Sequence, residues 1–269
     1  AESALLMQAF VLGCYLLAGA GLVTFFGSAE PGFRDVGNFN ANEFAITAGL
    51  GIPMAWYLGL HSRGRLLVWL NLLYPLLAIA AVVLAASRGG LLTTLVAVSV
   101  IPFTLPRLGV GRRLALFVVI ALGIWGIFVY APQAFPNLQE NIERLASTDE
   151  ELAEGTLTGR TTIWAAGLEL FQESPVLGIG MRSFRWAAEP ILGTQKTPHN
   201  AFLEAAVGGG LVGLLLFASL PLLALLSALT MRGGARPFML ALVLALLVAM
   251  QPSNAGDRKF TWFVLTLFS

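Results

Sequence analysis

The chain has 269 residues, of which 57% are hydrophobic and only 12% charged, and its formal net charge is +1. A soluble domain carries about twice that charged fraction, and several apolar runs here are long enough to cross a bilayer as helices. One cysteine and two histidines exclude a disulfide framework and argue against a metal site built from these residues. The composition therefore predicts an all-α polytopic membrane protein without a metal ion.

Seven apolar stretches are predicted to span the membrane, joined by short polar or glycine-rich connections. They cover residues 4–26, 44–60, 66–86, 91–105, 114–131, 200–228 and 237–252. Ser87-Arg88-Gly89-Gly90 is interpreted as a breaker-rich turn between the third span and the fourth. The chain does not start with Met, and its last apolar run, 260–269, is too short to span. We therefore expect further helices outside the numbered residues.

Residues 132–199 form the one long polar stretch, and nearly half of the chain's charged side chains lie in it. Leu138, Ile142 and Leu145 recur at the spacing of an amphipathic helix that lies on a membrane surface. A loop this long with helices of its own is usually functional. The chain is therefore divided into membrane helices at 1–131, a large loop at 132–199 and further membrane helices at 200–269.

A second helix is predicted inside this loop, from Thr158 to Glu173. Thr158 is placed to cap its N-terminus, Arg160 opens its first turn, and Ser174-Pro175 ends it. Its apolar face is expected to carry Trp164, Leu168 and Phe171. The run that follows, Val176-Leu177-Gly178-Ile179-Gly180, is interpreted as a close-packed turn.

Arginines in the short connections predict how the chain crosses the membrane. The connections 61–65, 106–113 and 231–236 contain arginine but neither Asp nor Glu. Because cytoplasmic loops of membrane proteins are enriched in Lys and Arg, these three are assigned to the cytoplasmic side. By alternation, the long loop, the 87–90 turn and the polar segment before the second span share the outer face.

Three residues on that outer face are the first candidates for chemistry: Arg88, Arg160 and His199. Arg160, at a helix start beside Trp164, offers forked donors to phosphate oxygens, and an ion pair with a nearby Glu or with headgroups is the alternative. Arg88 lies close to the hydrocarbon, where a charge indicates function unless it snorkels to the headgroups. His199 precedes Asn200, a natural N-cap, and the positive helix end favours the neutral imidazole that a general base requires. An interfacial histidine without a task is the alternative for His199.

Several further residues have more than one interpretation. Asn40 and Asn42 suit sugar hydroxyls and turn or cap positions equally well. Asn200, Arg182 and Glu204 are candidates for glycan contact or for supporting the site. Four glycines of the sixth span are expected to serve close helix packing: Gly208, Gly209, Gly210 and Gly213. Neither a P-loop nor an Asp-x-Asp pair occurs, so no nucleotide site and no nucleic-acid partner is expected.

Four spaced motifs together resemble the O-antigen ligase and O-antigen polymerase family. They are Ser87-Arg88-Gly89-Gly90, Gly159-Arg160 with Trp164 following, Pro175-x-x-Gly178-x-Gly180, and Pro198-His199-Asn200-x-Phe202-Leu203-Glu204. The segment Phe39-Asn40-Ala41-Asn42 is similar to the Asn-containing segment before the central helices of that family. The order of the motifs around one large outer loop carries the resemblance, because no motif is specific alone. Gly90 departs from the many relatives that have another small residue there.

The resemblance implies a lipid-dependent, GT-C-like glycosyltransferase in the bacterial inner membrane, with a large periplasmic loop and an active site that faces the periplasm. It implies a glycan donor linked to undecaprenyl diphosphate and, in the ligase branch, lipid A–core oligosaccharide as acceptor, with no metal or other cofactor. By the motifs, His199 is the essential histidine, and Arg88 and Arg160 bind the diphosphate.

Three other functions remain as alternatives. An O-antigen polymerase and a protein O-oligosaccharyltransferase use the same donor, with a second lipid-linked repeat unit or a protein as acceptor. A lipid-glycan transporter belongs to a different class. Against transport, no ionisable residue lies near the middle of a predicted span, and no pair of interrupted helices is predicted. Membrane lipids are partners in every case.

Overall fold

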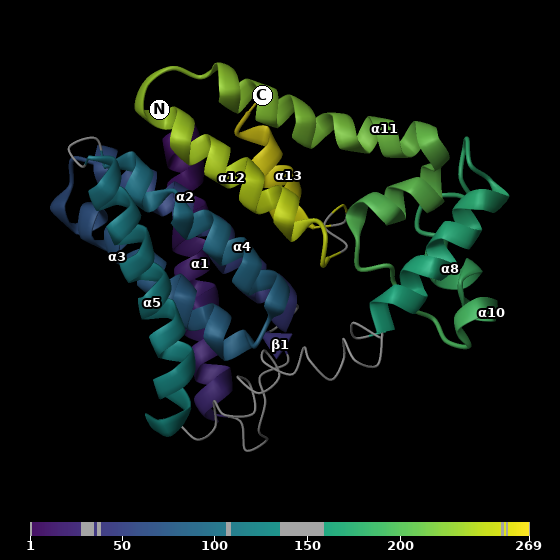
Figure 1. Ribbon diagram of the computed structural model, residues 1–269, viewed down its shortest axis with the longest axis horizontal. Helices are drawn as coiled ribbons and strands as arrows, with labels where there is room; N and C mark the ends of the chain where they lie inside the picture. Colours follow the sequence, from purple (N-terminus) through teal and green to yellow (C-terminus); the bar gives the residue numbers. More distant parts are fainter. Residues whose placement is uncertain are drawn as a thin grey trace. The chain divides into compact units, whose positions relative to one another are not determined.

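The computed structural model describes residues 2–27, 35–36, 39–105, 109–134, 159–253, 256 and 258–268. In these residues the protein is built of helices, apart from a two-residue antiparallel ladder of β1 (Asp35–Val36) and β2 (Phe39–Asn40) (Figure 1). The predicted all-α membrane protein is thus confirmed. Two compact units are described separately: unit 1 is Ala1–Ala146 with Ala228–Ala245, and unit 2 is Ser147–Ser227 with Leu246–Ser269. The predicted amphipathic helix at 138–145 lies outside the described residues.

Unit 1 is organised around α2 (Ala41–His61). It packs against three helices that lie beside it in Figure 1: α1 (Glu2–Gly27), α3 (Arg65–Ala85) and α4 (Arg88–Ser99). Residues 43–55 of α2 are all buried, so each of its faces has a neighbour. Glycines let two of these neighbours approach: a Cβ on Gly49 would lie 2.7 Å from the Thr94 hydroxyl, and one on Gly51 would lie 2.5 Å from the Tyr74 hydroxyl.

Polar side chains also join the helices of unit 1. Asn71 of α3 is fully buried and exchanges two hydrogen bonds with Gln8 of α1, at 2.8 and 3.3 Å. The Tyr74 hydroxyl donates to the Ala48 carbonyl of α2 at 2.7 Å. Buried polar groups without partners are costly in an apolar surrounding, so these bonds favour one arrangement of α1, α2 and α3.

Four helices of the described residues are long and apolar enough to cross a membrane: α1, α2, α3 and α11 (Ala201–Thr230). Two further predicted spans are shorter than expected. α4 has 12 residues and continues into a short 3-10 turn (Ile101–Thr104), and α12 (Arg236–Ala249) has 14 residues. At about 1.5 Å per residue they are roughly 18 and 21 Å long, less than the ~30 Å hydrocarbon core. α5 (Val110–Ala134) has 25 residues and contains the predicted fifth span.

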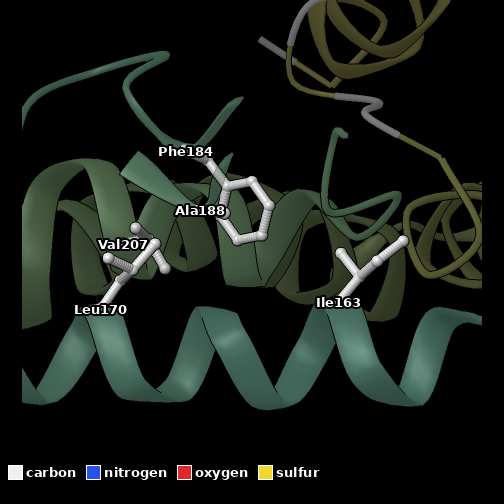
Figure 2. Close-up of a cluster of buried hydrophobic side chains, with 5 residues drawn as sticks. All are labelled: Ile163, Leu170, Phe184, Ala188 and Val207. Atoms are coloured by element: carbon white, nitrogen blue, oxygen red, sulfur yellow. The ribbon is translucent and has the colours of Figure 1, made fainter. Parts of the chain in front are cut away.

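Unit 2 contains α8 (Arg160–Glu173), the short helices α9 (Phe184–Ala187) and α10 (Glu189–Leu192), and α13 (Lys259–Thr266). Figure 2 shows Ile163 and Leu170 pointing from α8 toward Phe184, Ala188 and Val207, with which they form a buried cluster. The buried face of α8 therefore differs from the apolar face that was predicted. Ile163, Ala166, Gly167 and Leu170 are buried, whereas Leu168 is 57% exposed. The segment with Phe184 and Ala188 packs with α11 on the side of α8 that carries Ile163. Trp164 and Phe171 lie at the margin of the cluster.

The sixth predicted span is an interrupted helix. Gly210 has a φ of 63° and a ψ of −157°, and α11 bends there in Figure 1. Hydrogen bonds between the loop at 175–180 and α11 replace helical ones at the break. They run from N–H to carbonyl: Ile179 to Val207 (2.9 Å), Gly180 to Gly208 (2.9 Å), Leu211 to Pro175 (2.8 Å) and Val212 to Val176 (3.3 Å). The interruption was not predicted, because it depends on a loop that lies about 30 residues earlier.

Glycines are required where the loop crosses α11. A Cβ on Gly178, which has a φ of 70°, would lie 2.5 Å from the Gly208 carbonyl carbon, and one on Gly210 would collide with Val176. Gly208 and Gly210 are thus closely packed as predicted, but against the loop and not against another helix. At Gly209, no described atom lies within 4 Å of the corresponding position, so close packing was a wrong prediction there. The crossing fixes the loop that carries Arg182 and Arg185.

Candidate active site

The segment that contains His199 is held in place from both sides. The side-chain oxygen of Asn200 accepts hydrogen bonds from the two N–H groups of Phe202 and Leu203, at 3.0 Å each, and so caps α11. The Trp164 indole of α8 donates to the Pro198 carbonyl at 3.0 Å. Because both neighbours of His199 are anchored, the position of its backbone is fixed relative to α8 and α11.

His199 has a left-handed backbone, with a φ of 47°. Among the described residues, only two other non-glycine residues have a positive φ: Ala86 and Arg182. The left-handed conformation costs about 1–2 kcal/mol for such residues and is concentrated at functional sites. All three residues lie in or beside motifs singled out from the sequence. His199 belongs to one motif, Arg182 follows Gly180 by two residues, and Ala86 directly precedes Ser87-Arg88.

A pocket of about 530 Å³ opens beside the imidazole. It is lined by Arg160, Ile163, Arg185, Gln195, Lys196, Thr197 and His199. Three of these side chains are cationic, and none of the described lining residues is acidic. Such a pocket is suited to a ligand with several negative charges, because Arg and Lys donate charge-assisted hydrogen bonds to phosphate oxygens. The structure thus brings two of the predicted residues, Arg160 and His199, to one cavity.

The pocket also controls the protonation of His199. Burial of the imidazole, and in addition the positive charge of Arg160, lower the pKa of His199 from its ordinary value of 6.5, although part of the residue remains exposed to solvent. The His199 Nε2 atom lies 3.2 Å from the Thr197 hydroxyl, a hydrogen-bond distance. The lowered pKa favours the neutral imidazole, and Nε2 of His199 exchanges a hydrogen bond with an alcohol.

A second pocket, of about 390 Å³, adjoins the first. Its lining residues are Arg182, Phe184, Arg185, Trp186, Thr197, Pro198 and Glu204. Arg185 and Thr197 line both pockets, so the two cavities lie next to each other around these side chains. Arg182 and Glu204, two of the predicted supporting residues, line this second pocket and are not among the lining residues of the first.

Arg88 is placed in unit 1, as the first residue of α4. Its N-cap, Ser87, accepts a hydrogen bond from the Gly90 N–H at 3.0 Å and donates one to the Asn42 side chain at 2.7 Å. The predicted break between the two spans is confirmed but is shorter and lies at Ala86 and Ser87, because the cap lets the helix start at Arg88 and makes Gly90 helical. A Cβ on Gly90 would collide with Ala45 of α2, which explains why a minimal residue stands there.

The asparagines before α2 have capping and bridging contacts. Asn40 is the N-cap of α2: its side chain accepts from the Glu43 N–H at 2.9 Å and donates to the Glu43 carboxylate at 2.6 Å. Asn42 accepts from Ser87, as described above. Of the two interpretations of these residues, the structure therefore supports the cap for Asn40 and a link between α2 and α4 for Asn42.

Three charged residues of these two regions were missed in the sequence. Arg185 and Lys196 line the cationic pocket. Glu43 is buried at the start of α2, next to Asn42, which accepts a hydrogen bond from Ser87 beside Arg88. Lys196 had a signal, since it lies three residues before His199, whereas Arg185 had none because only the fold brings it there. Among the described residues, no group of three or more His, Cys, Asp or Glu side chains is placed to hold a metal ion.

Known proteins were compared with the chain. A family model described as O-antigen ligase matches residues 73–218, more than half of the chain. The chain belongs to the O-antigen ligase family. The matched region contains the Arg88, Arg160 and His199 motifs. A relative, exopolysaccharide production protein ExoQ of Rhizobium meliloti, is 36% identical over an alignment that covers 23% of this chain and 17% of the relative. The chain thus matches about one sixth of that relative's length. No solved structure matches the chain.

Proposed function

We propose that this O-antigen ligase family member is a membrane glycosyltransferase that transfers a glycan from undecaprenyl diphosphate to lipid A–core oligosaccharide, in lipopolysaccharide biosynthesis. The observation that carries the proposal is the cationic pocket of unit 2, in which Arg160, Arg185 and Lys196 surround the neutral His199. A diphosphate fits the charge of this pocket, and an acceptor hydroxyl fits its base.

In the proposed reaction, an acceptor hydroxyl oxygen attacks the anomeric carbon of the donor sugar. His199 takes the hydroxyl proton, for which its lowered pKa keeps the imidazole available. The bond from the anomeric carbon to the diphosphate oxygen breaks, and its electron pair stays on the diphosphate. Arg160, with Arg185 and Lys196, stabilises the charge that develops there. Direct displacement inverts the anomeric centre, and no step requires a metal ion.

The Thr197 hydroxyl supports this assignment of His199. It is an alcohol at hydrogen-bond distance from Nε2, and it lines both pockets. An acceptor hydroxyl that takes its place presents the proton to the same nitrogen. Thr197 then becomes free to hydrogen-bond to the substrate.

The roles of the residues in unit 1 rest on the family resemblance. We propose that Arg88 is a second diphosphate-binding residue and that Asn40 and Asn42 act through the helix starts that they stabilise. We further propose that Asn200 orients His199 by capping α11, that the protein lies in the bacterial inner membrane, and that the 132–199 loop faces the periplasm. The arginine-rich connections support this orientation.

An O-antigen polymerase is the second candidate, because the relative in Rhizobium meliloti is named for exopolysaccharide production. A polymerase uses the same donor and the same pocket, and only its acceptor, another lipid-linked glycan, differs. A protein O-oligosaccharyltransferase again differs in the acceptor. A transporter gives the neutral histidine of the pocket no chemical task.

Reconstituted protein with defined substrates tests the proposal. A lipid-diphosphate glycan is supplied with purified lipid A–core, with a second molecule of the lipid-linked glycan, or with a serine-containing acceptor protein, each with and without EDTA. The ligase produces glycosylated lipid A–core in both conditions. Product only with the second lipid-linked glycan identifies a polymerase, and product only with the protein identifies an oligosaccharyltransferase. Movement of the donor across the bilayer without any transfer contradicts the proposal.

A further inference from the structure

The second pocket differs from the cationic pocket in having a large exposed aromatic side chain. Trp186 is 63% exposed, although it lies in the short helix α9, where its neighbours Phe184 and Ala188 are almost fully buried. The guanidinium carbon of Arg185 lies 5.6 Å from the centroid of the Trp186 ring and restrains the indole through a cation–π contact. The ring is thus held at the pocket while most of its surface remains open.

Two of the polar side chains that line this pocket have planar charged groups and come from different elements. Arg182 lies in the loop and Glu204 in the first turns of α11, and both line the cavity together with Trp186. A guanidinium and a carboxylate each present two hydrogen-bonding atoms in one plane, which suits vicinal hydroxyl groups. Arg182 has a left-handed backbone with a φ of 63°, so its position is maintained against a conformational cost.

An aromatic face beside planar donors and acceptors is the combination that binds a sugar ring. The C–H face of a pyranose packs on the indole, and its hydroxyls reach the guanidinium and the carboxylate. A volume of about 390 Å³ lies within the range of small-molecule sites. The position of the pocket indicates which sugar it takes, because Arg185 and Thr197 also line the diphosphate pocket. The sugar directly bonded to the diphosphate is the one that extends into the neighbouring cavity.

We propose that the second pocket is the subsite for the first sugar of the donor, stacked on Trp186 and hydrogen-bonded by Arg182 and Glu204. The proposal rests on the proposed function, since it takes the first pocket as the diphosphate site. It adds a specificity determinant that selects the donor by its sugar and not by its lipid.

A binding experiment tests this subsite without requiring transfer. The probes are a short-chain prenyl diphosphate with a single hexose and the same prenyl diphosphate without a sugar. In the wild type the hexose-bearing probe binds more tightly. Trp186→Ala reduces the ratio of the two affinities by roughly five- to tenfold. Trp186→Phe retains most of that ratio, because the sugar contacts the aromatic face. Trp69→Ala is the matched control, since Trp69 is 60% exposed in α3 of unit 1 and leaves the difference unchanged.

The sugar-free probe separates the possible failures. Its affinity is unchanged in Trp186→Ala, which also shows that the variant is folded, and it falls in Arg160→Ala. If Trp186→Ala weakens both probes equally, Trp186 is an anchor for the lipid and the sugar subsite is overturned. If the variant raises the KM for the acceptor and leaves donor binding intact, the pocket holds the acceptor sugar and the donor assignment is overturned. A sugar-free probe whose binding does not depend on Arg160 contradicts the diphosphate pocket, and with it the proposed function.

Discussion

Arg88 and His199 are supported by two different kinds of structure. Arg88 starts a regular helix. The serine that caps this helix is its neighbour in sequence, and the contacts of the helix start are with other helices of unit 1. His199 lies in an irregular segment whose Pro198 carbonyl accepts a hydrogen bond from Trp164, 34 residues before Pro198. The comparison shows that unit 1 presents its arginine by helix geometry, whereas unit 2 builds its pocket from side chains of α8, α9 and the irregular segment before α11.

The largest effect is expected at the base of unit 2. His199→Ala should reduce the rate of glycan transfer by roughly 10²–10⁴-fold, because the hydroxyl proton loses its acceptor. The other histidine provides the control: His61 stacks on Tyr57 at the end of α2, with ring centroids 4.3 Å apart, and His61→Ala should transfer normally. Single-turnover transfer by reconstituted protein measures both. Equal transfer rates for His199→Ala and His61→Ala would contradict the assignment of the base to unit 2.

Arginine replacements compare the two regions directly. Arg160→Ala should lower transfer by on the order of 10²-fold, since one charge-stabilising group is lost, whereas Arg65→Ala, an exposed arginine at the start of α3, should have no effect. If Arg88 binds the same diphosphate, the double variant with Arg88→Ala loses less than the product of the two single effects. Independent, multiplicative losses would assign Arg88 another role. Steady-state kinetics with varied donor concentration is the measurement.

Glycine replacements test the crossing of the loop and α11. Gly178→Ala should destabilise unit 2 by about 2 kcal/mol or more, because its φ is 70° and a Cβ would meet the backbone of Gly208. Gly209→Ala is the matched control, and it should be neutral or slightly stabilising in its helical surroundings. Thermal unfolding in detergent reports both. A destabilisation of the same size at Gly209 would mean that an added Cβ is tolerated poorly throughout this region, and not specifically at the crossing.

The smallest effects are expected at the single hydrogen bonds that anchor each region. Trp164→Phe removes the donor to Pro198 and should cost about 1 kcal/mol and several-fold in transfer, because His199 is then less well positioned. Ser87→Ala removes the α4 cap and should cost a similar amount of stability, about 1 kcal/mol. Transfer rates and unfolding midpoints of the two variants, measured side by side, check this. A large loss of activity in Ser87→Ala alone would show that the unit 1 helix start is the more sensitive of the two.

The sequence predicted most of what depends on local pattern. The helix positions follow from apolar runs, and the start of α8 at Arg160 and the cap at Asn200 follow from local chemistry. The break at Ser87 was predicted, but its length was overestimated, because a Ser-x-Gly-Gly run predicts a longer break unless the serine accepts from the Gly90 N–H and starts a helix. Gly159, with a φ of 72°, likewise takes the cap position that had been expected at Thr158.

Long-range features could not be predicted in this way. The interruption at Gly210 requires the hydrogen bonds of the 175–180 loop, and a single sequence does not show that these segments meet. Arg185 joins Arg160 and His199 only because α9 packs over α8. Arg160 and His199 could thus be singled out from the sequence one by one, whereas the cavity that they share and the second pocket could not.

The central claim is that His199 is a neutral base in a cationic pocket, and its titration tests this most directly. NMR of isotope-labelled histidine in a His61→Gln background isolates the His199 signal, because the chain has two histidines. We predict a pKa below 6.5 that rises in Arg160→Gln, since the charge of Arg160 contributes to lowering it. The neutral form then dominates above that pKa, so transfer should increase with pH through the same value and level off at neutral pH. A pKa at or above 6.5, or one that Arg160→Gln leaves unchanged, would contradict the account.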